Sequence, residues 1–197
     1  MSSVDAVILA SGLSRRMGVE KLLLPFGEVT VLEYFLQRLP FSLFNRVFLI
    51  TSDAAAAIVE KKYPLTIIIN ETREQGKSQA IRLGARLSQA VDGVLFCVAD
   101  QPLLKETTIY TLLQSFLQHP EYITIPRAAG KSRNPVIFPA ALRPELQQLH
   151  GDEGGKVVIR KNKERLVYVD FDNAEQFCDL DTPEKYQALL RTLAGKA

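Results

Sequence analysis

The stretch that decides the fold lies near the beginning of the chain, where VDAVILA at residues 4–10 runs directly into SGLSRRMGVEKLLLP at residues 11–25. The first seven residues are almost continuously apolar, as the central strands of a parallel sheet are when both of its faces are covered. The residues that follow mix glycines, hydroxyls and cations, which is typical of a loop. A buried strand that ends in such a loop indicates an α/β protein.

Short apolar runs alternate with helical patterns along the rest of the chain. Further strands are predicted at residues 46–51, 66–69, 93–99, 122–125 and 166–169. The strand at 122–125 is expected to stop at Pro126, because proline cannot donate to a sheet ladder. Helices are predicted at residues 31–39, 54–62, 77–90, 105–118 and 140–149, after the glycine cluster at 151–155, and from 183 to about 193. This alternation predicts a three-layer, Rossmann-like α/β fold with a mostly parallel central sheet.

Two of these helices carry further signals. Thr182 followed by Pro183 predicts a helix start, with threonine as the N-cap and proline at the first helical position. The helix at 105–118 carries an apolar stripe that we expect to face the core. The stripe consists of Ile109, Leu112, Leu113, Phe116 and Leu117.

Length and composition favour a single domain that spans residues 1–197. Apolar residues make up 47% and charged residues 23% of the chain, and the net charge is +2. Such a balance does not favour a nucleic-acid or membrane-surface partner. No apolar run is long enough to span a bilayer, and no basic leader precedes residue 8, so we expect a cytoplasmic protein. Cys97 and Cys178 lack metal-site spacing and are predicted to be small core residues.

The loop at residues 10–25 is a candidate anion site, because ligands of open α/β sheets bind at the carboxyl ends of the strands. Glycines allow close approach of the backbone, and backbone N–H groups together with cations can surround phosphate groups. The relevant residues are Gly12, Gly18, Ser11, Ser14, Arg15, Arg16 and Lys21, with Glu20 as the opposing anion.

Other phosphate-binding motifs do not fit the chain. Gly76-Lys77-Ser78 and the sequence at 130–132 resemble the end of a P-loop, but Glu71 and Ile125 stand where that motif requires its first glycine. The first loop also lacks the dinucleotide-binding spacing of three glycines.

Three carboxylates are candidate metal ligands. Asp100 directly follows the strand predicted at 93–99 and therefore lies at the same edge of the sheet as the first loop. Asp179 and Asp181 are two residues apart, so that in extended chain both would project to one side. Because Mg²⁺ is bound by one or two carboxylates with phosphate oxygens and water, this edge is a candidate magnesium site.

Several motifs of the chain resemble those of a known protein family. The string LASGLSRRMGVEK at residues 9–21 resembles the signature of the molybdenum cofactor cytidylyltransferases and their guanylyltransferase relatives, within the MobA-like nucleotidyltransferases. Asp100-Gln-Pro, Asn134-Pro-Val, Gly151-Asp-x-Gly and Asp179-x-Asp-Thr-Pro follow in the order of that family. Ser11 departs from the family, which has alanine or glycine at this position.

The resemblance implies roles for individual residues. Arg16, Lys21 and Asp100 would be catalytic, and Asp100 with Asp181, the one we favour over Asp179, would hold Mg²⁺. Residues 1–127 would bind the nucleotide, and elements within 127–170 the acceptor. The implied nucleotide contacts are Leu9, Ala10, Ser11, Gly12, Ser14, Arg15, Arg16, Lys21, Gly76 and Ser78. The implied acceptor contacts are Asn134, Pro135, Gly151, Asp152 and Gly154.

The function that the resemblance implies is a Mg²⁺-dependent transfer of CMP from CTP to molybdopterin, with or without bound molybdenum, with release of pyrophosphate. The product would go to a recipient molybdoenzyme. Two alternatives stay open. The enzyme could use GTP or another small phosphorylated acceptor, or the chain could be a non-catalytic carrier that inserts the finished cofactor into a molybdenum hydroxylase.

Overall fold

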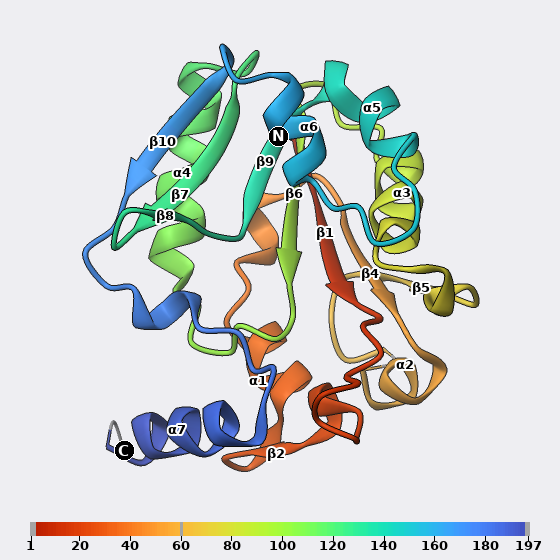
Figure 1. Ribbon diagram of the computed structural model, residues 1–197, viewed down its shortest axis with the longest axis vertical. Coiled ribbons are helices and arrows are strands. Elements are labelled where there is room, and N and C mark those ends of the chain that lie inside the picture. Colours follow the sequence, from red (N-terminus) through yellow and green to blue (C-terminus); the bar gives the residue numbers. More distant parts are fainter. Residues whose placement is uncertain (1–2, 60, 196–197) are drawn as a thin grey trace.

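The computed structural model describes residues 3–59 and 61–195, and a single large sheet runs through the molecule (Figure 1). Its strands are β1 (Val4–Ala10), β4 (Val47–Thr51), β5 (Thr66–Ile69), β6 (Gly93–Val98), β7 (Ile123–Ala128), β8 (Lys131–Ser132), β9 (Val136–Pro139) and β10 (Leu166–Asp170). They lie in the order β10-β7-β9-β6-β1-β4-β5, with β8 paired to β7. A small second sheet pairs β2 (Pro25–Phe26) with β3 (Val29–Thr30).

The central sheet is mostly parallel, as predicted. β1 pairs parallel with β4 and β6, β4 with β5, and β10 with β7. β9 lies antiparallel between β6 and β7, and β8 is antiparallel to β7. The parallel arrangement of β1, β4, β5 and β6 brings their carboxyl ends to one edge, where the loops after β1 and β6 meet.

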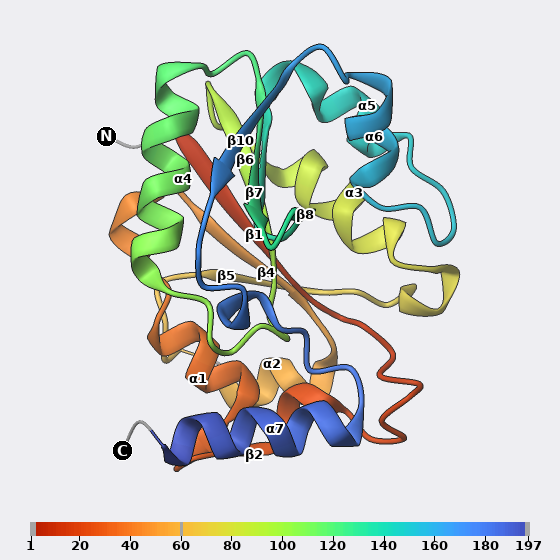
Figure 2. The same ribbon diagram turned by 60° about the vertical axis from the view of Figure 1, so that its left-hand side comes forward.

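Helices cover both faces of the sheet and make the predicted three layers. They are α1 (Val31–Gln37), α2 (Asp53–Val59), α3 (Ser78–Leu87), α4 (Glu106–Gln118), α5 (Arg143–Gln147), α6 (Lys156–Lys161) and α7 (Pro183–Ala194). Figure 2 shows α1 and α4 on one face and α3, α5 and α6 on the other.

The alternation of β1 explains the two cores. Ile8 belongs to the apolar cluster under α1 and α4, whereas Val7 belongs to the cluster under α3 and α5. Successive side chains of a strand point to opposite faces, so one continuous apolar strand supplies both layers. All residues of β1 except Leu9 are buried, including Asp5.

Several local predictions were wrong. β7 does not stop at Pro126 but continues through it. Pro126 lies between Thr124, which pairs with β9, and Arg127, which pairs with β8. The missing N–H of the proline therefore removes no hydrogen bond of either antiparallel pairing. Leu117 is 47% exposed because it lies beside the buried stripe of α4. Residues 140–149 form a 3₁₀ turn followed by α5, in which Pro144 stands in the first turn.

Other predictions were confirmed or refined. Thr182 caps α7 by accepting a hydrogen bond from the Lys185 N–H (3.4 Å). Cys97 is buried, and burial raises the pKa of its thiol to about 12, whereas Cys178 is only half-buried against the core. Glu60, which the predicted helix at 54–62 includes, lies outside the described residues. No helix within the described ranges has the length and apolar character needed to cross a membrane.

Candidate active site

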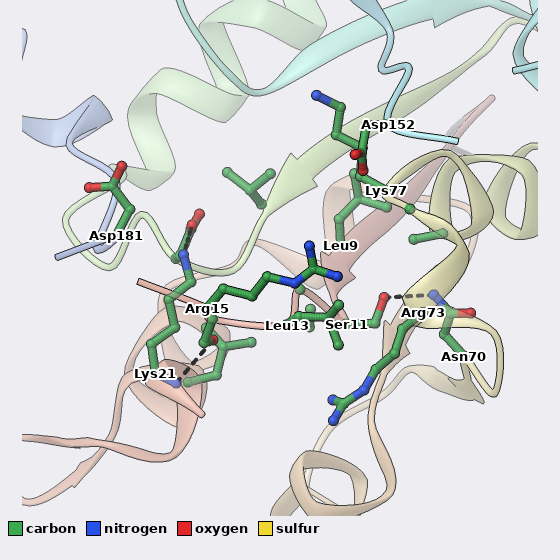
Figure 3. Close-up of a pocket in the computed structure, with 18 of the residues that line it drawn as sticks. Leu9, Ser11, Leu13, Arg15, Lys21, Asn70, Arg73, Lys77, Asp152 and Asp181 are labelled. Carbon is green, nitrogen blue, oxygen red and sulfur yellow. Dashed lines mark hydrogen bonds and ion pairs between the residues drawn. The ribbon is translucent and has the colours of Figure 1, made fainter. Parts of the chain in front are cut away.

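A pocket of about 650 Å³ opens at the carboxyl ends of β1 and β6 (Figure 3). Its walls come from the loop after β1, the segment between β5 and α3, the turn before α6 and the segment before α7. Predicted site residues that line it are Leu9, Ala10, Ser11, Gly12, Ser14, Arg15, Arg16, Lys21, Gly76, Asp100, Gly151, Asp152 and Asp181. The fold therefore gathers segments that are far apart in sequence into one cavity.

The loop after β1 is folded back on itself. Ser14, at φ 49°, accepts hydrogen bonds from the Met17 N–H at its carbonyl (2.9 Å) and from the Lys21 N–H at its hydroxyl (3.3 Å). Gly18 also has a left-handed φ, of 68°. The hydroxyl of Ser52, at the start of α2, donates to Glu20 and anchors the far side of the loop. These bonds hold the loop in its folded-back shape, and its cations Arg15, Arg16 and Lys21 line the pocket.

The cations of this loop meet the carboxylates from the later segments. Lys21 donates to Asp100 Oδ2 across 79 positions of sequence. Arg16 Nη1 lies 3.0 Å from Asp181 Oδ2, and Lys185 of α7 approaches the other oxygen of Asp181 to 2.7 Å. The first ion pair links the loop after β1 to Asp100 at the end of β6. The second links the same loop to Asp181 in the segment before α7.

The two carboxyl groups have opposite pKa shifts. Burial raises the pKa of Asp100 above its usual range, and the nearby Asp179 adds to this, although Lys21 opposes it. The hydrogen bond from Lys185 lowers the pKa of Asp181, with help from the charges of Arg16 and Lys21. A buried carboxylate that is not fully compensated by a cation favours the arrival of further positive charge.

The donor set fits a hard divalent cation. Asp100 Oδ1 is buried and accepts no hydrogen bond within the described ranges, so one carboxylate oxygen lacks a partner. Asp179, which also lines the pocket, accepts from Gln101 Nε2 (2.8 Å). No group of three or more His, Cys, Asp and Glu side chains is arranged to hold a metal in the described part of the chain. Two carboxylates completed by phosphate oxygens and water are the ligand set that Mg²⁺ commonly takes.

Some predicted site residues lie outside the cavity lining. Ser78 is fully buried at the start of α3, where its N–H donates to the Gly151 carbonyl (3.1 Å) and its hydroxyl has no partner in the described structure. Gly154 does not line the pocket either, but the side chain of Lys77, which does line the pocket, packs against Gly154. Asn134 is exposed and Pro135 buried just before β9, and neither is part of the lining.

The structure also adds residues to the site that the sequence analysis missed. Asn70, Arg73 and Lys77 line the pocket from the segment between β5 and α3. Asn70 directly follows the predicted strand at 66–69, so the rule that ligands bind at the carboxyl ends of parallel strands was the signal that could have found it. Lys77 and Asp152 line the side of the pocket opposite Lys21 and Asp181 in the view of Figure 3.

The cationic loop with its glycines and serines faces carboxylates at the carboxyl edge of a three-layer α/β sheet, an arrangement whose groups suit phosphate groups and a divalent cation. Residues 6–166 match the MobA-like NTP transferase domain, and the chain belongs to this family of nucleotidyltransferases. The family membership inferred from the sequence motifs is thereby confirmed.

Curated relatives align over almost the full chain. The purine catabolism protein PucB of Bacillus subtilis is 24% identical over 200 residues, which cover 95% of this chain and 96% of PucB. The molybdenum cofactor cytidylyltransferase of Escherichia coli is 25% identical over 192 residues, 94% of this chain and 95% of the relative.

Solved structures share the fold. An Rv0371c homologue from Mycobacterium sp. strain JC1 superposes with a TM-score of 0.83 at 25% identity, with both chains fully covered. Rv0371c of Mycobacterium tuberculosis, in complex with manganese, superposes with a TM-score of 0.76 at 24% identity, over 96% of this chain and 98% of the other.

Proposed function

We propose that this nucleotidyltransferase transfers CMP from CTP to the phosphate of molybdopterin, with or without bound molybdenum, and releases pyrophosphate. The observation that carries the proposal is the meeting of Arg16 and Lys21 with Asp181 and Asp100 in a pocket of about 650 Å³. Charges of both signs, placed side by side, suit a triphosphate and its divalent cation. The molybdenum cofactor cytidylyltransferase among the relatives supports the choice of substrates.

The reaction needs no base from the protein. An oxygen of the acceptor phosphate, already ionised at neutral pH, forms a bond to the α-phosphorus of CTP, and the bond from that phosphorus to the bridging oxygen breaks as pyrophosphate leaves. Lys21 and Arg16 neutralise charge on the phosphates, and N–H groups of the loop after β1 donate to them. The pocket would position donor and acceptor for the transfer, so catalysis would consist of positioning and charge stabilisation.

Asp100 and Asp181 would hold Mg²⁺, and the unpartnered Asp100 Oδ1 supports this assignment. The ion would supply Lewis-acid polarisation of the phosphate oxygens. For Asp100 and Asp181 to bind it, Lys21 and Arg16 must exchange their carboxylate partners for phosphates. The manganese complex of Rv0371c fits a divalent cation in this fold.

We assign the acceptor to the part of the chain at residues 127–170. Gly151 and Asp152 line the pocket there, and Gly154 lies next to the Lys77 side chain. Asn134 and Pro135 belong to the same part of the chain. We place the protein in the cytoplasm, where the product would pass to a recipient molybdoenzyme. No nucleic acid or membrane takes part in this proposal.

The decisive experiment measures pyrophosphate release with CTP, GTP, ATP or UTP, each with molybdopterin and with or without Mg²⁺. We expect release that requires Mg²⁺ and acceptor and is fastest with CTP. Faster release with GTP would replace the cytidylyl assignment with a guanylyl one. No release with any nucleotide, combined with tight binding of finished cofactor, would favour the carrier function instead.

A further inference from the structure

We propose that Lys185, in the first turn of α7, competes with the divalent cation for Asp181 and so weakens the hold of the protein on that cation. The proposal rests on the proposed function only in taking Asp181 as a metal ligand. Neither the nucleobase, the acceptor nor the transfer step enters it.

Lys185 and Arg16 lie beside different oxygens of Asp181. Lys185 Nζ is 2.7 Å from Asp181 Oδ1, whereas Arg16 Nη1 is 3.0 Å from Oδ2. Each oxygen of this carboxylate therefore has a positive side chain next to it. A divalent cation that binds Asp181 meets a like charge at either oxygen, unless the side chain moves away.

The two side chains differ in what a bound nucleotide offers them. Arg16 lines the pocket, so the phosphates of a nucleotide can draw it away from Asp181. Lys185 is not part of the lining, and phosphates in the pocket therefore give it no new partner. When a triphosphate has taken Arg16, Lys185 remains beside the carboxylate. The cation then binds an aspartate that still has one positive neighbour.

The start of α7 fixes the position of Lys185. The Thr182 hydroxyl accepts from the Lys185 N–H (3.4 Å), and the capped turn brings the lysine back to Asp181, four positions earlier. The first turn of a helix is where its dipole disfavours a positive charge. The helix by itself thus gains nothing from a lysine at this position, and the group that the lysine serves is Asp181.

Electrostatics sets the direction and the size of the effect. A positive charge next to a metal ligand lowers the affinity for the metal, because it occupies the carboxylate and repels the ion. The Lys185 side chain is 47% exposed, so water screens its charge and it has room to move aside. The effect is therefore modest. With Lys185 in place, the cation depends more on the phosphates of the nucleotide than on the protein.

The test measures the Mn²⁺ affinity of Lys185→Met by paramagnetic resonance of the free ion, without nucleotide or acceptor. We expect Mn²⁺ to bind about threefold more tightly than to the parent, because the competing charge is gone. Methionine is a good helix former and keeps the backbone N–H that Thr182 caps, so the fold should persist. Thermal unfolding checks that each variant is folded at the temperature of the measurement.

Arg16→Met provides a contrast at the other oxygen of the same carboxylate. Without nucleotide, its loss should also tighten Mn²⁺ binding. With CTP present, and after correction for Mn²⁺ bound to free CTP, only Lys185→Met should keep its gain. Arg16 has by then moved to the phosphates, where its removal weakens the complex, whereas Lys185 still faces Asp181.

Three controls separate competition at Asp181 from a general loss of charge. Lys185→Arg keeps the charge and should bind Mn²⁺ like the parent. Lys163→Met removes an exposed lysine between α6 and β10, at the opposite edge of the sheet. In an Asp181→Asn background, Lys185→Met should change the Mn²⁺ affinity no more than Lys163→Met does, because Lys185 acts through Asp181.

Calorimetry of CTP without metal supplies a second readout. Lys185→Met should lower this affinity no more than Lys163→Met does, because Lys185 does not line the pocket. A larger loss would assign Lys185 to the phosphates and overturn the proposal. So would Mn²⁺ binding to Lys185→Met that is no tighter than to Lys163→Met, since the ion pair would then be purely structural. Tighter Mn²⁺ binding without any transfer to molybdopterin would support the proposal while the proposed function fails.

Discussion

Two carboxylates, Asp100 and Asp181, would form the proposed metal site, and their environments differ. Asp100 is held by one lysine at one of its oxygens, whereas Asp181 has a cation close to each oxygen. The first environment disfavours the ionised carboxylate by burial, and the second stabilises it. The same residue type therefore has pKa shifts of opposite direction at the two positions, because the surroundings differ.

We expect Asp100→Asn to lower turnover by at least ~10², since it removes a charged ligand of the cation that would balance the phosphate charge. The fold should persist, because the amide oxygen can still accept from Lys21. Pyrophosphate release and thermal unfolding measure the two effects. Asp172→Asn, at an exposed position, is the matched control. Near-normal Mg²⁺-dependent turnover in Asp100→Asn would exclude Asp100 as a metal ligand.

The structure also separates the two later carboxylates. Asp179 is engaged by Gln101, whereas Asp181 faces Arg16, which a triphosphate would draw away. We expect Asp181→Asn to weaken Mn²⁺ binding in the presence of CTP more than Asp179→Asn does. Paramagnetic resonance of free Mn²⁺ measures both affinities. The reverse order would move the second metal ligand to Asp179.

At the scale of elements, capping and short turns place the helices that surround the site. Thr30 and Glu33 form a capping box at the start of α1: the Thr30 hydroxyl accepts from the Glu33 N–H, and the Glu33 carboxylate accepts from the Thr30 N–H. Lys62 lies 2.8 Å from the same carboxylate and joins the segment after α2 to α1. One glutamate therefore fixes both a helix start and a contact between neighbouring segments.

The stability of this box should depend on pH. The hydrogen bond from Lys62, with the bonds from Thr30, lowers the pKa of Glu33 below its ordinary value of 4.5. Since the folded-state pKa is the lower one, the contribution to stability is fully present above 4.5 and is lost as pH falls through the folded-state pKa. We expect Glu33→Gln to lower the free energy of unfolding at pH 7 and to lower it by less at pH 3, below the ordinary pKa of 4.5.

Urea unfolding at the two pH values measures this difference. Glu28→Gln, at an exposed position between β2 and β3, is a control for the loss of one negative charge. An equal destabilisation by Glu33→Gln at pH 7 and pH 3 would show that charge plays no part in the box.

At the scale of the whole molecule, the spacing between layers depends on small residues where a helix touches the sheet. A Cβ at Gly84 of α3 would lie 2.4 Å from Cγ1 of Val7 in β1, which is closer than two carbons can approach. The position of α3 matters for the site, because the segment before this helix carries Asn70, Gly76 and Lys77.

We therefore expect Gly84→Ala to lower the free energy of unfolding by about 1–3 kcal/mol, because the helix must move away from the sheet. Denaturant unfolding measures the change. Gly12→Ala provides a contrast in stability, since a Cβ there meets no atom within 4 Å. A Gly84→Ala variant as stable as the parent would mean that the two layers can separate at little cost.

The sequence by itself determined the α/β class, the parallel core of the sheet, the candidate loop after β1 and the position of Asp100 at the end of β6. These follow from local patterns, because apolar periodicity defines strands and a strand end locates its loop. The family motifs added the residues expected to take part. Local rules were wrong at Pro126 and Leu117, where the neighbours across the sheet and under the helix decide the outcome.

Only the tertiary structure decided which residues face one another. The pairings of Arg16 with Asp181 and of Lys21 with Asp100, the bond between Asn70 and Ser11, and the burial of Ser78 outside the pocket all join or separate residues distant in sequence. No periodicity in the sequence encodes such contacts, because they depend on how the layers of helices and strands pack. The chemistry of the site therefore depends both on residue types, which can be read from the sequence, and on distances between them, which only the folded structure sets.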